Sequence, residues 1–156
     1  MRLRCWPRGR TRADEERESL LAARLARQEI LARDEPPLVY ALLDEAVLNR
    51  PVGSAEVMHG QLMHLAELAE RVTISIQVVP YGAGAHIGLL GAFVIAEAPE
   101  MSATVFLENA ADGQTAEDTD RVAQIVTSWD ALRGEALTVG ASRELILKVA
   151  EERWTH

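Results

Sequence analysis

The sequence predicts a small α+β domain in which about four helices pack on a sheet of about four mostly antiparallel strands. Two periodicities carry this prediction: apolar residues recur at helical spacing in four segments, and shorter strand-like runs lie between them. The 156 residues are 48% hydrophobic, enough for one packed core and too much for extended disorder. We therefore expect a single domain over residues 13–156, preceded by a basic, flexible arm at residues 1–12.

The first half of the chain is expected to form a helix, a strand and a second helix. The first helix runs from about Ala13 to Arg33 and stops before Pro36-Pro37. Leu38–Leu43 has the apolar composition of a fully buried strand. Ser54 fits the N-cap of a helix from Ala55 to Glu70. The inner face of that helix is expected to consist of Met58, Leu62, Leu65, Leu68 and Ala69.

Strands are expected in the middle of the chain. In Thr73–Val79 apolar and polar residues alternate, as in a half-buried strand, and Pro80 ends the pattern. Ala92–Glu97 and Ala103–Asn109 follow. Their short connection predicts an antiparallel pair.

The last quarter of the chain is expected to form two helices. Thr115 and Asp118 resemble a capping box that would open a helix ending near Ala136. The final helix is expected near Thr138–Arg153. Trp129 is expected to pack in the core, whereas packing and exposure remain alternatives for Trp154. The other expected inward residues are Val122, Ile125, Val126 and Leu132 in the first helix and Ser142, Leu145, Ile146 and Val149 in the second.

The candidate site is the glycine-rich loop over residues 81–91, which is longer than the joining of two strands requires. Its GxGxxxG spacing and the strand that follows exclude a dinucleotide-binding fingerprint. His86 lies in the middle of the loop, either as a packed structural group or as a functional one. We expect the loop, which begins at Tyr81, to form one wall of a pocket or partner groove beside Asp44 and Glu45.

Two polar residues of the first helix extend this candidate site. Arg24 and Gln28 fall inside the apolar stripe defined by Leu20, Leu21, Leu25 and Leu31. Because an unpaired buried charge is prohibitively costly, Arg24 is expected to pair with Asp44 or Glu45. The candidate ligand- or partner-binding residues are therefore Arg24, Gln28, Asp44, Glu45, Tyr81 and His86.

The charge distribution disfavours nucleic acid as a partner. The net charge is −8, and five arginines precede every acid, which leaves 11 bases against 24 acids, or −13, from residue 13 onward. Such a body repels DNA, so we expect no specific nucleic-acid binding.

Metal, membrane and disulfide chemistry are not indicated. His59 and His64 lie five residues apart and cannot share a metal as an i, i+4 pair does, so both are expected at the surface. Cys5 is the single cysteine, and no apolar run approaches the length of a membrane span. We expect a cytoplasmic protein without a cofactor.

Three segments resemble a known family. They are RLARQEIL at residues 24–31, LDEAVLNRPVGSAEVMHGQLMHL at 43–65 and SIQVVPYGAGAHIGLLGAF at 75–93. Together they are similar to the C-terminal domain, of unknown function, of actinobacterial helix-turn-helix regulators described as antitoxin-like, over about residues 12–153. Members also carry an N-terminal helix-turn-helix domain and a segment resembling VPGLLQTEDYARALL, and both are missing here.

The resemblance implies a stand-alone binding domain whose partner is a small protein or a small-molecule ligand. A homodimer formed through the sheet or the last helices is a further expectation of this reading. The alternative is a cofactor-independent enzyme, a cyclase or isomerase of a specialised biosynthetic pathway. In that case His86 or Glu45 would act as general acid or base, and Arg24 would stabilise developing negative charge.

Overall fold

The computed structural model describes residues 12–98, 101–107, 114–116 and 118–155. The predicted basic arm lies almost wholly outside these residues, as do the two residues 99–100 of the expected turn between the paired strands. The chain divides into two compact units, Met1–Leu38 and Val39–His156, and each is described by itself.

The first unit contains helix α1, Arg12–Gln28, which continues as a short 3-10 helix, η1, Glu29–Ala32. This confirms the predicted helix to within two residues at each end. Leu20, Leu21 and Leu25 are exposed on α1 at 64%, 58% and 54%. The apolar stripe is therefore present, but the structure shows no burial of these three leucines.

The second unit begins with a two-stranded parallel sheet. Strand β1, Val39–Asp44, pairs with β2, Ile74–Val79, from Val39 opposite Ile74 to Asp44 opposite Val79. Helices α2, Glu45–Asn49, and α3, Ala55–Leu68, connect the two strands. The prediction that β1 is fully buried is wrong: its residues are half-buried and Tyr40 is 52% exposed. The reason is that α4 and α5 pack chiefly against β2, which leaves β1 less covered.

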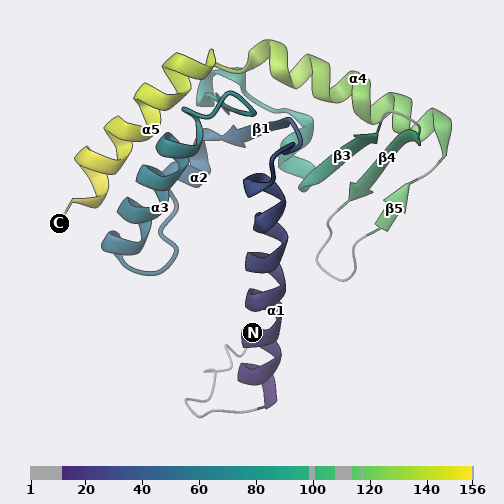
Figure 1. The fold of residues 1–156 in the computed structure, drawn as a ribbon. Helices are drawn as coiled ribbons and strands as arrows, with labels where there is room; N and C mark the ends of the chain where they lie inside the picture. The colour runs from purple at the N-terminus through teal and green to yellow at the C-terminus, as the bar shows by residue number, and fades with distance from the viewer. Residues whose placement is uncertain (1–11, 99–100, 108–113, 117, 156) are drawn as a thin grey trace, which may run out of the picture. The chain divides into compact units, whose positions relative to one another are not determined.

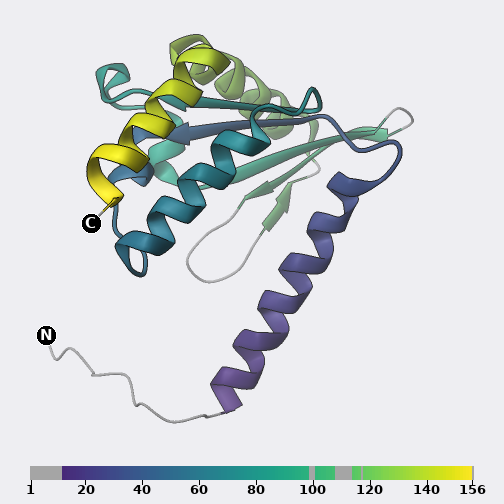
Figure 2. The same cartoon turned by 60° about the vertical axis from the view of Figure 1, so that its left-hand side comes forward.

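Helix α5, Val139–Trp154, completes the packing around this sheet. It lies beside α3 and contacts β2, as Figures 1 and 2 show. The shared core is apolar and includes Leu48, Met58, Leu62, Ala66, Ile76, Val78, Ile146 and Ala150. Trp154 is buried there and its Nε1 donates to the Leu48 carbonyl oxygen at 2.9 Å, which decides between the two alternatives for this residue.

A second sheet is antiparallel and lies under α4, Thr119–Glu135 (Figure 1). Its strands are β3, Phe93–Ala98, β4, Met101–Leu107, and β5, Gln114–Ala116. The predicted antiparallel pairing of β3 with β4 is confirmed. Val105 and Ile125 form the centre of this packing, and Trp129 meets Phe93 edge-to-face with 6.2 Å between ring centroids. The α+β class is confirmed, and the described strands divide between two sheets.

The junction between α4 and α5 is hydrogen-bonded to the edge of β2 that faces away from β1. The Leu137 N–H donates to the Val78 carbonyl at 2.8 Å, and the Val78 N–H donates to Ser142 Oγ at 2.9 Å. Gln77 Nε2 also donates to the Leu137 carbonyl at 2.8 Å. The first two bonds satisfy the backbone polar groups of Val78 without a further strand, and they explain why Ser142 is fully buried.

Two helix starts test the predicted caps. Ser54 Oγ accepts from the Val57 N–H at 3.3 Å, which confirms Ser54 as the cap of α3. A hydrogen bond from the Ser54 side chain also lowers the pKa of Glu56. The capping box at Thr115 is wrong: Thr115 lies in β5, and Asp118 itself caps α4 by accepting from the Arg121 N–H at 3.0 Å.

Among the described residues, no helix is both long enough and apolar enough to cross a membrane.

Candidate functional site

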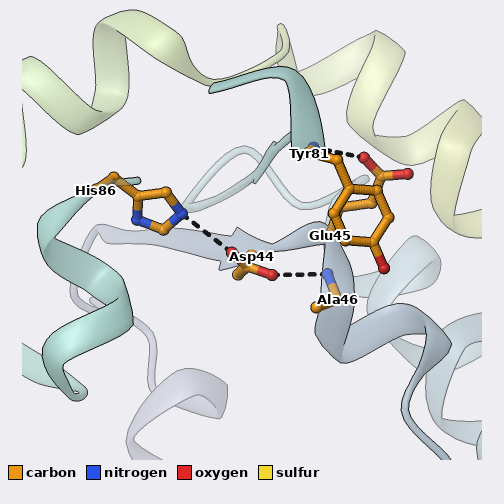
Figure 3. Close-up of polar contacts among 5 residues, drawn as sticks. All are labelled: Asp44, Glu45, Ala46, Tyr81 and His86. Carbon is orange, nitrogen blue, oxygen red and sulfur yellow. Dashed lines mark hydrogen bonds and ion pairs between the residues drawn. The ribbon is translucent and has the colours of Figure 1, made fainter. Parts of the chain in front are cut away.

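The candidate site is built where β1 ends and α2 begins. Asp44 is the last residue of β1 and the N-cap of α2, because its Oδ1 accepts from the Ala46 N–H at 2.7 Å. Its other oxygen, Oδ2, lies 3.0 Å from His86 Nε2 (Figure 3). One carboxylate therefore starts a helix and holds a loop side chain at the same time.

His86 is turned inward from the loop. It lies between two 3-10 turns, η2, Tyr81–Ala83, and η3, Ile87–Leu90, and its side chain is 11% exposed. An ionised carboxylate can only accept, so the hydrogen bond to Asp44 requires the proton on Nε2. In the neutral ring this leaves Nδ1 as a lone-pair acceptor.

The Nδ1 atom is closed off by the loop itself. It is buried and has no hydrogen-bond partner in the part of the chain that the structure describes. A Cβ added at Gly88 would lie 3.0 Å from Nδ1, so the imidazole occupies the space into which a side chain at position 88 would project. Leu132 Cδ2 of α4 would lie 3.6 Å from the same Cβ. A side chain at position 88 would therefore require the ring to shift by a few tenths of an ångström.

Glu45 holds the beginning of the same loop. Its Oε2 accepts from the Tyr81 N–H at 2.9 Å, and the Tyr81 side chain remains exposed (Figure 3). Asp44 and Glu45 are neighbours in sequence, and they fasten the loop at residues 81 and 86. We call these two interactions, Asp44 with His86 and Glu45 with Tyr81, the loop clamp.

The structure thus brings together four of the six predicted site residues: Asp44, Glu45, Tyr81 and His86. Arg24 and Gln28 lie on α1 in the other unit, where both are exposed. Their convergence with the other four, including a pair between Arg24 and Asp44 or Glu45, stays a prediction.

The remaining histidines are placed on α3. His64 is exposed and its Nδ1 lies 3.9 Å from Glu67 Oε2, while His59 is half-buried rather than fully at the surface. No group of three or more His, Cys, Asp or Glu side chains that could hold a metal ion occurs among the residues described.

Sequence reasoning missed the apolar side chains that the loop turns outward. Leu89 and Leu90 are 59% and 88% exposed. The signal was present as GLLG at residues 88–91, because two adjacent large apolar residues between glycines leave no neighbouring side chain to cover them. The loop therefore has a polar inner side, used by the clamp, and an apolar outer tip.

The fold and this site define an α+β domain that displays a fastened glycine-rich loop beside the carboxyl ends of two parallel strands. The chain belongs to the family described as a domain of unknown function, DUF5753, and the match spans residues 1–148. No curated protein and no solved structure matches the chain.

Proposed function

We propose that the chain is a cytoplasmic protein-binding domain, and that residues 81–91 are the part that contacts the partner. One observation carries this proposal. Tyr81 and His86 of the loop bond to the clamp carboxylates, while the side chains of Leu89 and Leu90 are exposed to solvent. Exposed apolar side chains that adjoin one another are more typical of interaction surfaces than scattered ones.

The clamp is the second support for this proposal, because it restricts the conformations of the loop before a partner binds. Both carboxylates hold fixed points in the loop, and Gly84 and Gly91 adopt φ values of +70° and +147° that other residues rarely adopt. A loop that is already ordered loses less conformational entropy on binding. Such a surface suits a protein partner, since the leucines project outward.

The sequence resemblance supports a regulatory partner. Two of the three segments similar to antitoxin-like regulators, residues 43–65 and 75–93, contain the whole clamp and both leucines. We therefore infer that the domain corresponds to the partner-binding half of an actinobacterial helix-turn-helix regulator of that kind, and that its partner is a small protein.

The enzyme alternative receives less support from the same geometry. An imidazole oriented by Asp44 would act as a base through its other nitrogen. That atom, Nδ1, is buried against Gly88, so a substrate would have to displace the loop to reach it. The pair is better placed to hold the loop than to transfer protons.

The proposal is tested by replacing the outer tip without touching the clamp. The unmodified chain should capture a partner protein from the lysate of its native host. The double variant Leu89→Ser and Leu90→Ser should no longer capture that protein. Measured with that purified protein, the dissociation constant should rise by at least about tenfold, because about 1.5 kcal/mol or more is lost when a buried leucine contact is removed.

Val72→Ser is the matched control, because Val72 is completely exposed and lies outside the loop. It should leave capture and affinity unchanged. A partner that binds the Leu89/Leu90 variant as tightly as the unmodified chain, or a chain that captures no protein, would disprove the proposal.

A further inference from the structure

The contact between Asp44 and His86 continues into the turn that carries the exposed leucines. His86 Nε2 lies 3.0 Å from Asp44 Oδ2 (Figure 3), and the His86 carbonyl accepts from the Leu89 N–H at 3.1 Å. His86 is also the residue from which the turn η3 begins. The side chain of His86 is therefore bonded to the end of β1, and its backbone is bonded to the turn that presents Leu89 and Leu90.

The other contact of the loop clamp ends in a separate turn. Glu45 accepts from the N–H of Tyr81, with which η2 begins. The bonds of η2 are local: the Ala83 N–H donates to the Pro80 carbonyl at 2.9 Å, and the Gly84 N–H donates to the Tyr81 carbonyl at 3.2 Å. Within the described loop, no backbone hydrogen bond joins η2 to η3. The two contacts of the clamp therefore hold different parts of the loop.

Asp44 holds the loop without giving up its own helix. A carboxylate has two acceptor oxygens: Oδ1 accepts from the Ala46 N–H at the start of α2, and Oδ2 faces His86. A substitution at position 86 therefore removes the contact with the loop and leaves the cap of α2 in place. The effect on the loop can in this way be measured separately from any effect on α2.

Helix α4 gives η3 a second support. A Cβ added at Gly88 would lie 3.6 Å from Leu132 Cδ2, so the turn lies against α4. Apolar packing of this kind has no preferred direction, whereas a hydrogen bond has one. The packing against α4 can hold the turn close to the domain, and the bond between His86 and Asp44 sets its orientation.

We infer that His86 is a positioning residue for partner binding: held by Asp44, it fixes η3 so that Leu89 and Leu90 are presented in one orientation. This role rests on the proposed function, in which the two leucines contact the partner. A tip that is ordered in advance loses less conformational entropy on binding. Loosening His86 should therefore weaken binding although every side chain that contacts the partner is still present.

The first test needs no partner and follows amide hydrogen exchange by NMR in the intact chain. His86→Leu keeps an apolar side chain in place of the ring but has no donor for Asp44. The Leu89 amide should then exchange at least about tenfold faster, because a hydrogen bond to a carboxylate no longer opposes opening of the turn. An unchanged rate would overturn the inference, because α4 alone would then hold the turn.

His86→Gln is the conservative variant. The amide nitrogen of glutamine lies the same number of bonds from Cβ as Nε2 of histidine, so it can donate to Asp44. The Leu89 amide should exchange at nearly the rate of the unmodified chain. Exchange as fast as in His86→Leu would show that the shape of the ring, rather than its N–H, holds the turn, and this result would also overturn the inference.

Glu45→Ala tests whether the two contacts of the clamp are separate. It should speed exchange of the Tyr81 amide, which donates to Glu45, and leave the Leu89 amide unchanged. The Val78 amide, which donates to the buried Ser142 hydroxyl, should stay protected in every variant and shows that the chain is folded. Equal effects of Glu45→Ala and His86→Leu on Leu89 would contradict a distinct role for His86.

The second test measures the binding kinetics of the captured partner. His86→Leu should raise the dissociation constant by at least about tenfold, and His86→Gln should restore most of the affinity. The loss should appear in the association rate, because fewer molecules present the tip in the binding orientation while the contacts in the complex are unchanged. A faster dissociation at an unchanged association rate would overturn the inference, because it would mean that His86 stabilises the complex itself.

The proposed function and the role of His86 can fail independently. A chain that captures no protein disproves the proposed function, whatever the exchange rates are. An unchanged Leu89 exchange rate in His86→Leu overturns the positioning role even when a partner binds. Val72→Ser, at a completely exposed position outside the loop, is the control for both tests and should change neither the exchange of Leu89 nor the binding rates.

Discussion

The imidazole of His86 is held by Asp44 at Nε2, and its Nδ1 lies where a side chain at position 88 would project. The carboxylate orients the ring, and the absence of a side chain at position 88 leaves room for it. Each of these two features depends on one residue, so substitutions at Asp44 and at Gly88 should test them separately.

Gly88→Ala should destabilise the loop clamp. The new Cβ would lie 3.0 Å from Nδ1 and 3.2 Å from Cε1, so the ring must move, at a cost of about 1–3 kcal/mol for overpacking. Urea unfolding would measure this loss. Gly82→Ala is the control: a Cβ at Gly82 meets nothing within 4 Å, and its unfolding free energy should change little. Equal stability of the two variants would show that position 88 does not confine the ring.

Asp44 and His86 should be energetically coupled. Asp44→Ala removes both the cap of α2 and the partner of Nε2, while Asp44→Asn keeps a side chain that can cap. In a double-mutant cycle with His86→Ala, we expect Asp44→Ala to show a coupling energy of about 0.5–3 kcal/mol. Additive effects within experimental error would mean that the two side chains act independently.

At the scale of elements, β2 is the strand on which the second unit depends. It pairs with β1 on one side, and the α4–α5 junction bonds its backbone at Val78 on the other. The hydroxyl of Ser142 takes the place that a neighbouring strand would occupy. This arrangement ties α5 to the sheet through a polar contact as well as through apolar packing.

Ser142→Ala should therefore cost more than its small change in volume suggests. It leaves the buried Val78 N–H without its acceptor, and an unsatisfied buried donor costs about 1–3 kcal/mol. Ser128→Ala is the control, because Ser128 Oγ donates only to the Gln124 carbonyl within α4. Chemical unfolding of both variants should show the difference, and a loss no larger than in the control would indicate that Val78 finds another acceptor.

For the whole molecule, the net charge of −8 sets the expected behaviour toward nucleic acid. An acidic body repels the phosphate backbone, so any binding should be weak and without sequence preference. In an electrophoretic mobility assay at physiological salt we expect no sequence-dependent shift. A retarded complex that survives excess competitor DNA would contradict this expectation.

Local periodicity was sufficient to locate most elements. The helix beginning after Ser54 and the alternating strand that became β2 were placed correctly, because side-chain spacing and capping chemistry are properties of neighbouring residues. The capping box failed for a related reason. Thr115 and Asp118 have the right spacing for it, but the pairing of Thr115 with Phe106 in the sheet overrides that local signal.

The candidate site shows the same division between local and distant information. The sequence by itself determined that a glycine-rich loop carries His86 and that Asp44 and Glu45 follow an apolar run. Only the tertiary structure decided that His86 meets Asp44 across 42 residues, that Tyr81 meets Glu45 across 36, and that Val78 meets Ser142 across 64. Such contacts depend on how the strands and helices close over one another, and no spacing along the chain records that closure.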